Sequence, residues 1–124
     1  GTARSLAKIY GALANGGSRD GVHVLSPEII ELARQTESDG KDLVLAQMHT
    51  RFGLGFMLGT EDVSMGPNKN SMGHGGAGGS LGFADPDNNI SLGFRMNQMD
   101  AGITAWKTAT DVAYSVYKTL SIKT

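Results

Sequence analysis

A histidine followed by small residues is the segment of this sequence best suited to chemistry. His74 precedes Gly75, Gly76, Ala77 and Gly78. A strand without bulky side chains can lie against a substrate and present backbone N–H groups to it, which an oxyanion hole requires. The imidazole of His74 changes charge near neutral pH and could reach the reacting centre from the start of such a strand. The pattern therefore suggests an edge strand that flanks a substrate.

The glycines of this segment also fit two other interpretations. Gly73, Gly75 and Gly78 match G-x-G-x-x-G, but a dinucleotide-binding loop needs an apolar strand before it and a helix after it. Here a polar segment, 67–71, precedes the glycines and a hairpin is expected to follow, so no helix N-terminus is available for a pyrophosphate. The glycines could also serve only to let a helix or loop pack closely on the sheet. On the residues alone, this structural role stays open.

Ser5 and Lys8 form an S-x-x-K pattern, which would place a serine and a lysine on one helical face. An activating lysine must lose its proton, which requires burial or a cationic neighbour in a closed site. Arg4, Lys8 and Asn15 lie opposite the apolar side of the expected helix. We therefore predict that Ser5 is exposed and does not act as a nucleophile.

The remaining polar and aromatic candidates favour structural roles. His23 and His49 lie in expected linking segments without ligand-like spacing. Asp85 and Asp87 are typical of a turn, and Trp106 is expected to anchor the last helix in the core. The sequence thus predicts no metal site and no cofactor.

Composition narrows the classes of partner. The 124 residues suit one small domain or part of a larger one. Eleven basic and twelve acidic residues nearly balance, so non-specific nucleic-acid binding is not expected. No apolar segment approaches the roughly 20 residues of a membrane span, and the absence of cysteine leaves the compartment undetermined.

The elements that must position His74 follow from periodicity and turn residues. Thr2 is a candidate N-cap of the first helix, and Ser26-Pro27 has the form of a helix start. The sequence predicts helices at 3–14 and 27–37, strands at 51–58, 74–83 and 90–96, and a helix at 102–120. The buried stripe of the last helix is expected to comprise Ile103, Trp106, Ala109, Ala113, Val116 and Leu120. Residues 38–50 show no clear pattern.

This order of elements predicts an α+β fold with an antiparallel sheet of about three strands and flanking helices. Three strands covered by a helix can be stable. Such a sheet still has two open edges, which need a partner or protection. Self-association through these edges is therefore a possible interaction.

Several short motifs resemble a known family in the same order along the chain. They are Thr2-Ala3-x-x-Leu6-Ala7, Arg51-Phe52-Gly53-Leu54-Gly55-Phe56, His74-Gly75-Gly76-Ala77, Asp85-Pro86 and the strand from Ile90 to Asn97. Together they resemble the β-lactamase and penicillin-binding-protein superfamily, especially class C β-lactamase-like proteins and family VIII esterases. The resemblance implies the C-terminal portion of a β-lactamase/transpeptidase-like fold.

The resemblance also implies roles for individual residues. His74 stands where the family's third motif, K-T-G, has lysine, and Gly75-Gly76 replace Thr-Gly. The backbone N–H of Ala77 would be an oxyanion donor beside the catalytic His74. The residues implied to bind substrate are Gly75, Gly76, Gly78 and Asn97. A neutral imidazole suits a substrate carboxylate less well than an ammonium, so His74 favours ester or peptide-like acyl substrates over classical β-lactams.

We expect residues 1–124 to be the C-terminal segment of a serine hydrolase domain. The S-x-x-K serine and an assisting tyrosine are expected upstream of residue 1, so the missing N-terminal part would be a partner and this segment alone would be inactive. The substrate would be a small ester, amide or β-lactam-like acyl compound. The alternatives are a non-catalytic β-lactamase-like protein used for binding or as a scaffold, and a small independent α+β binding module.

Overall fold

The computed structural model describes residues 1–101 and 106–123. Its three helices are α1 (Ala3–Ala14), α2 (Pro27–Ala33) and α3 (Lys107–Thr119). Its strands are β1 (Ser18–Arg19), β2 (Val22–His23), β3 (Ser38–Asp42), β4 (Met48–Phe52), β5 (Met57–Leu58), β6 (Met72–Gly75), β7 (Leu81–Asp85) and β8 (Ile90–Phe94). No helix in the described ranges is long and apolar enough to cross a membrane.

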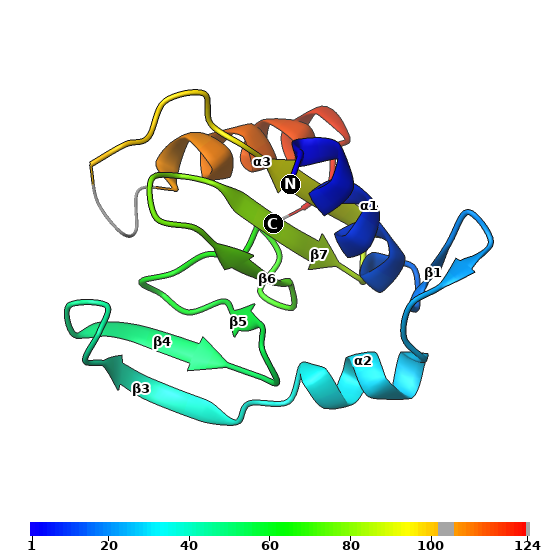
Figure 1. Ribbon diagram of the computed structural model, residues 1–124, viewed down its shortest axis with the longest axis horizontal. Coiled ribbons are helices and arrows are strands. Elements are labelled where there is room, and N and C mark those ends of the chain that lie inside the picture. Colours follow the sequence, from blue (N-terminus) through cyan, green and yellow to red (C-terminus); the bar gives the residue numbers. More distant parts are fainter. Residues whose placement is uncertain (102–105, 124) are drawn as a thin grey trace.

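The main sheet is antiparallel and has the order β3-β4-β5-β6-β7-β8, while β1 and β2 form a separate hairpin (Figure 1). The α+β class is confirmed, but the prediction of about three strands is wrong because the main sheet has six. Two of the predicted strands each contain a turn that divides them. Gly55 and Gly78 occupy these turns at φ +81° and +88°, a region of backbone conformation that glycine adopts without strain.

The sequence pattern did not predict the hairpin of β3 and β4. β3 consists of Ser-Asp-Gly-Lys-Asp, and four of its five residues are exposed. Strand prediction depends on alternating apolar residues, and an edge strand with two solvated faces does not need them. Its charged residues also protect this edge of the sheet from further pairing.

The helix α1 packs closely on one face of β7 and β8 because this face carries glycine. The pairing His74↔Gly82 and Gly82↔Gly93 places these three residues side by side, on the face covered by α1. A Cβ at Gly93 would lie 2.6 Å from the backbone nitrogen of Ala7. A Cβ at Gly82 would collide with the ring of Tyr10. Gly82 and Gly93 therefore make room for α1 on this face of the sheet.

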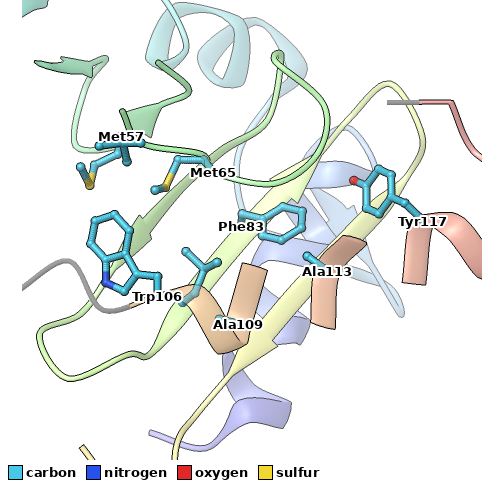
Figure 2. Packing of buried hydrophobic residues seen from close by; sticks show 9 residues of the cluster. Met57, Met65, Phe83, Trp106, Ala109, Ala113 and Tyr117 are labelled. Atoms are coloured by element: carbon cyan, nitrogen blue, oxygen red, sulfur yellow. The ribbon is translucent and has the colours of Figure 1, made fainter. Parts of the chain in front are cut away.

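The opposite face of the sheet carries the larger apolar core (Figure 2). Phe83 and Leu81 of β7 pack there with buried residues of α3. The buried positions of α3 are Ala109, Ala113 and Tyr117. The predicted stripe is thus wrong at its C-terminal end, where Val116 and Leu120 are exposed. Its first residue, Ile103, and the predicted start of the helix at Gly102 lie outside the described residues.

Substitution of Gly93 by alanine is expected to destabilise the fold by about 1–3 kcal/mol, since the new methyl group forces α1 away from β8. Gly59→Ala is a matched control, because a Cβ at Gly59 meets only the Lys69 carbonyl oxygen at 3.6 Å, an ordinary contact. Urea unfolding of both variants measures the difference. Equal midpoints for Gly93→Ala and Gly59→Ala would contradict this packing of α1.

Candidate active-site strand

The strand β6 runs into a tight turn that contains the predicted oxyanion donor. The Gly79 N–H donates to the Gly76 carbonyl oxygen at 3.1 Å, which closes the turn around Ala77 and Gly78. The positive φ of Gly78 at the third position is that of a type II turn. The Gly76 N–H donates to Ser80 at 2.7 Å, so the beginning and the end of the loop are joined.

β6 is an internal strand, so its prediction as an edge strand is wrong as stated. It lies between β5 and β7, but β5 pairs only with Met72 and Gly73. His74 and Gly75 therefore extend past the end of β5. Because the Gly76 N–H faces β7 and successive N–H groups of an extended chain alternate in direction, the next one, at Ala77, faces away from β7. Among the described residues, this N–H has no hydrogen-bond partner.

The side chain of His74 is exposed and stands on the same sheet face as α1. Its Nδ1 lies 2.6 Å from the Gly75 carbonyl oxygen. A carbonyl oxygen only accepts, so Nδ1 carries the proton in this hydrogen bond, and in the neutral ring Nε2 is left as an acceptor. The imidazole also lies beside the ring of Phe52, with centroids 6.1 Å apart. This arrangement presents an imidazole nitrogen able to accept a proton.

Trp106 supports the turn from the opposite face of the sheet. Its indole Nε1 donates to the Gly76 carbonyl oxygen at 3.0 Å. The ring also fills the space that a Cβ at Gly75 would need, with Nε1 only 2.6 Å from that position. Trp106 is 7% exposed and belongs to the main core cluster. The prediction that Trp106 anchors the last helix in the core is confirmed. The contact also explains why residue 75 is a glycine, since a larger side chain would collide with the indole.

Asn97 lies at the same end of the sheet as this turn. It follows the end of β8 at Phe94, and the nearby Asp100 N–H donates to the Gly78 carbonyl oxygen at 3.0 Å. The Asn97 side chain is exposed. In the described part of the chain, no hydrogen bond joins it to His74 or Ala77. The fold therefore gathers the predicted residues at one end of the sheet without direct contact between Asn97 and the other two.

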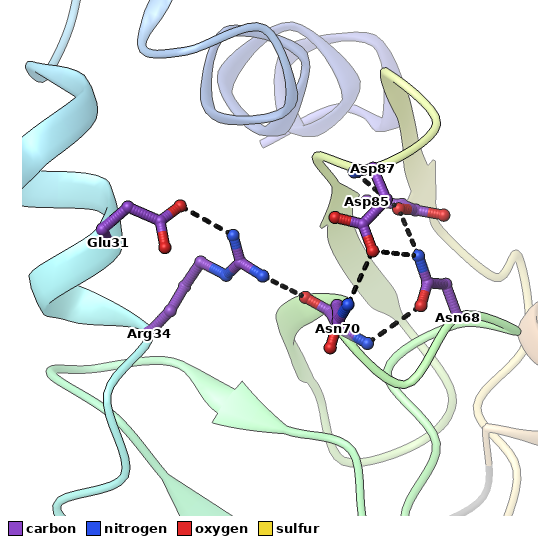
Figure 3. A network of polar contacts seen from close by, with 6 residues as sticks. All are labelled: Glu31, Arg34, Asn68, Asn70, Asp85 and Asp87. Atoms are coloured by element: carbon purple, nitrogen blue, oxygen red, sulfur yellow. Dashed lines mark hydrogen bonds and ion pairs between the residues drawn. The ribbon is translucent and has the colours of Figure 1, made fainter.

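The opposite end of β7 carries a polar network (Figure 3), which includes Asp85, Asp87, Asn68 and Asn70. Asp85 is fully buried, and the Asn68 amide donates to its carboxylate at 2.9 Å. The Tyr117 hydroxyl donates to the other oxygen of Asp85 at 2.5 Å. Burial raises the pKa of the Tyr117 hydroxyl, and the hydrogen bond to the Asp85 carboxylate raises it further. The pKa of the Asp87 carboxyl is lowered mainly by the hydrogen bond from the Asn68 amide and, to a smaller extent, by the hydrogen bond from the Asn70 amide.

Both aspartates occupy the predicted turn, because the N–H of Asp87 donates to Asp85 at 3.1 Å. The turn assignment is confirmed, but the sequence interpretation missed that Asp85 also connects the turn to α3 and to the loop before β6. One feature of the sequence could have indicated the burial of Asp85. This residue directly follows an apolar segment, 81–84, which overlaps the end of the predicted strand at 74–83. These residues lie at the end of β7 opposite the His74 turn and therefore form a structural site.

Ser5 serves as part of a helix cap. The Ser5 N–H donates to the Thr2 hydroxyl at 3.1 Å and the Thr2 N–H donates to the Ser5 hydroxyl at 3.2 Å, which is a capping box. Both Ser5 and Lys8 are exposed. The S-x-x-K pattern therefore lies on a solvated helix start, without the closed surroundings that activation of a nucleophile needs.

A model of the β-lactamase family matches residues 1–113. The chain belongs to the β-lactamase family. It is 36% identical over 99 residues to the esterase/β-lactamase LipL of Mycobacterium tuberculosis, an alignment that covers 79% of this chain and 22% of that protein. The resemblance found in the sequence motifs is thereby confirmed.

Solved structures agree with this family assignment. A penicillin-binding protein homologue from Caulobacter crescentus superposes with a TM-score of 0.88 at 34% identity, covering 94% of this chain and 31% of that one. A family VIII carboxylesterase superposes with a TM-score of 0.80 at 37% identity, covering 93% and 31%. This β-lactamase-family chain thus spans less than a third of the length of these relatives.

Proposed function

We propose that this chain forms one wall of the active site of a serine hydrolase that transfers an acyl group from an ester to water. The observation that carries the proposal is the turn after β6, where the Ala77 N–H, which has no hydrogen-bond partner among the described residues, lies three residues after the exposed His74 at an accessible end of the sheet. Membership of the β-lactamase family supports acyl transfer, as do relatives named as esterases and β-lactamases.

In this proposal the nucleophile is a serine from polypeptide outside the 124 residues. Its hydroxyl oxygen attacks the acyl carbonyl carbon, and the carbonyl oxygen becomes an oxyanion. The Ala77 N–H donates to that oxyanion, since it faces away from β7 and no other group in ranges 1–101 and 106–123 accepts from it. The bond to the alcohol then breaks, the alcohol leaves with a proton, and water releases the acid from the serine.

His74 is proposed to act on proton transfer or to bind the leaving group. Its Nδ1–H donates to the Gly75 carbonyl oxygen, so Nε2 remains the acceptor in the neutral ring. An imidazole lacks the fixed positive charge of a lysine at this position. We therefore propose neutral esters as better substrates than β-lactams, with Gly75, Gly76, Gly78 and Asn97 lining the substrate groove.

Labelling with a fluorophosphonate, which reacts with activated serines, tests the proposal. The full-length product of the gene that encodes this chain is expected to be labelled at a serine outside residues 1–124 and to hydrolyse p-nitrophenyl butyrate faster than nitrocefin. Ser5→Ala is expected to leave both results unchanged, at a stability cost of about 0.5–1 kcal/mol for the lost hydrogen bond from the Thr2 N–H to the Ser5 hydroxyl, since the Thr2 cap on the Ser5 N–H remains. The 124-residue chain alone is expected to show neither labelling nor turnover.

Two results would contradict the proposal. Absence of labelling and of ester turnover in the folded full-length protein would favour the alternative of a non-catalytic relative used for binding. Labelling of Ser5 itself, with loss of activity in Ser5→Ala, would place the nucleophile on α1 and overturn the assignment of Ser5 to a helix cap alone.

A further inference from the structure

We propose that Trp106 is a positioning residue that holds the Ala77 N–H in the direction of the substrate. This inference rests on the oxyanion role proposed above for that N–H. Trp106 is thirty residues from the turn in sequence and lies on the opposite face of the sheet from His74. It would therefore act on the reaction without touching the substrate.

The geometry of one peptide group links Trp106 to the Ala77 N–H. The Gly76 carbonyl oxygen and the Ala77 N–H belong to the same planar trans peptide, so they point in opposite directions. The Trp106 indole donates to that oxygen at 3.0 Å and the Gly79 N–H donates to it at 3.1 Å. Two donors thus fix the carbonyl, and the direction of the Ala77 N–H follows from it.

The indole itself is held in place by the core and by α3. Trp106 is buried within the main core cluster, where Figure 2 shows it close to Met57 and Met65. Its backbone carbonyl accepts hydrogen bonds from the Thr110 N–H at 2.9 Å and the Thr110 hydroxyl at 3.0 Å, at the first turn of α3. Contact with Gly75 limits movement of the ring toward β6. The support of the turn is therefore rigid.

The indole hydrogen bond affects the strength of the Ala77 N–H as a donor as well as its direction. A donor on a peptide oxygen polarises the whole peptide group and makes its N–H a better donor. An oxyanion hole is effective because its donors are oriented before the charge develops. Loss of the indole N–H is therefore expected to weaken the stabilisation of the transition state more than the binding of the uncharged ester.

The experiment replaces Trp106 in the full-length protein by β-(3-benzothienyl)alanine, which keeps the shape of the ring and removes only the N–H. Trp106→Phe is the encoded counterpart. With p-nitrophenyl butyrate, we expect kcat to fall about tenfold and KM to change less than twofold. Affinity for phenylboronic acid, whose tetrahedral serine adduct places an oxygen in the oxyanion position, is expected to fall by the same factor as kcat/KM.

Thr119→Val is the matched control, since it removes the same kind of hydroxyl-to-carbonyl hydrogen bond within α3, from the Thr119 hydroxyl to the Ser115 carbonyl oxygen at 2.8 Å, and leaves Trp106 and the Gly76 carbonyl untouched. It is expected to retain the kcat and boronate affinity of the parent protein. If the benzothienyl variant keeps parental kcat and boronate affinity while the parent hydrolyses the ester, the positioning role of Trp106 is refuted and the proposed function stands. If the parent itself shows no serine-dependent turnover, the proposed function fails first, and this inference with it.

Discussion

Gly75→Val is expected to reduce kcat/KM for ester hydrolysis by about 100-fold or more. A side chain at position 75 would occupy the space of the Trp106 indole, whose Nε1 would lie 2.6 Å from the new Cβ. Either the indole or β6 has to move. The indole donates to the Gly76 carbonyl oxygen and β6 leads directly into Gly76, so either movement displaces that carbonyl. Removal of a single oxyanion donor typically costs about 10²–10³ in kcat, and displacement of the turn affects that donor directly.

The same substitution is expected to lower the free energy of unfolding by about 1–3 kcal/mol, because it overpacks a core that is already filled. Activity on p-nitrophenyl butyrate and urea unfolding measure the two effects separately. A double-mutant cycle of Gly75→Ala with Trp106→Leu isolates their cause, since the collision disappears when the indole is absent. Additive stability losses in this cycle would show that the indole does not limit residue 75.

Asp85→Ala is expected to have the largest effect on stability, a loss of about 3–5 kcal/mol. Its buried carboxylate accepts hydrogen bonds from Tyr117 at 2.5 Å, from the Asn68 amide at 2.9 Å and from the Asn88 amide at 2.8 Å. Backbone N–H groups of the turn at Asp87 and Asn88 add two more. Truncation leaves several of these donors without an acceptor in a buried position.

Asp87→Ala is the matched control, because Asp87 accepts from the same Asn68 amide at 3.0 Å but is exposed to solvent. Its substitution is expected to cost less than about 1 kcal/mol, as for other solvated polar contacts. The shift of the urea midpoint in each variant measures these losses. Comparable shifts for Asp85→Ala and Asp87→Ala would indicate that Asp85 is not the centre of the network.

Short sequence patterns were sufficient to predict the helix starts and several turns of this chain. The N-caps at Thr2 and Ser26 start α1 and α2 as predicted, and their side chains accept the expected N–H bonds. The turns with glycine or asparagine, such as the turn closed by Asp85, were also identified. Such features depend on residues three or four positions apart, so a short stretch of sequence contains all the interactions that produce them.

The number of strands could not be predicted in the same way. β5 has two residues and exists because Met57 and Leu58 pair with Gly73 and Met72, which lie some fifteen residues away. β3 is polar and exposed, so it lacks an apolar pattern. On α3, Tyr117 is buried in place of Val116 because its hydroxyl reaches Asp85 of β7. Each of these outcomes depends on a partner distant in sequence.

The sequence by itself determined the family and the segment that carries His74 and its glycines, because motif order and residue type are properties of the chain. The tertiary structure decided which of those glycines are required, and for what. Gly82 and Gly93 make room for α1, Gly75 makes room for Trp106, and Gly78 allows the turn. It also showed that an indole thirty residues away holds the Gly76 carbonyl oxygen. Contacts of this kind arise only when the sheet and α3 pack together, so no local pattern contains them.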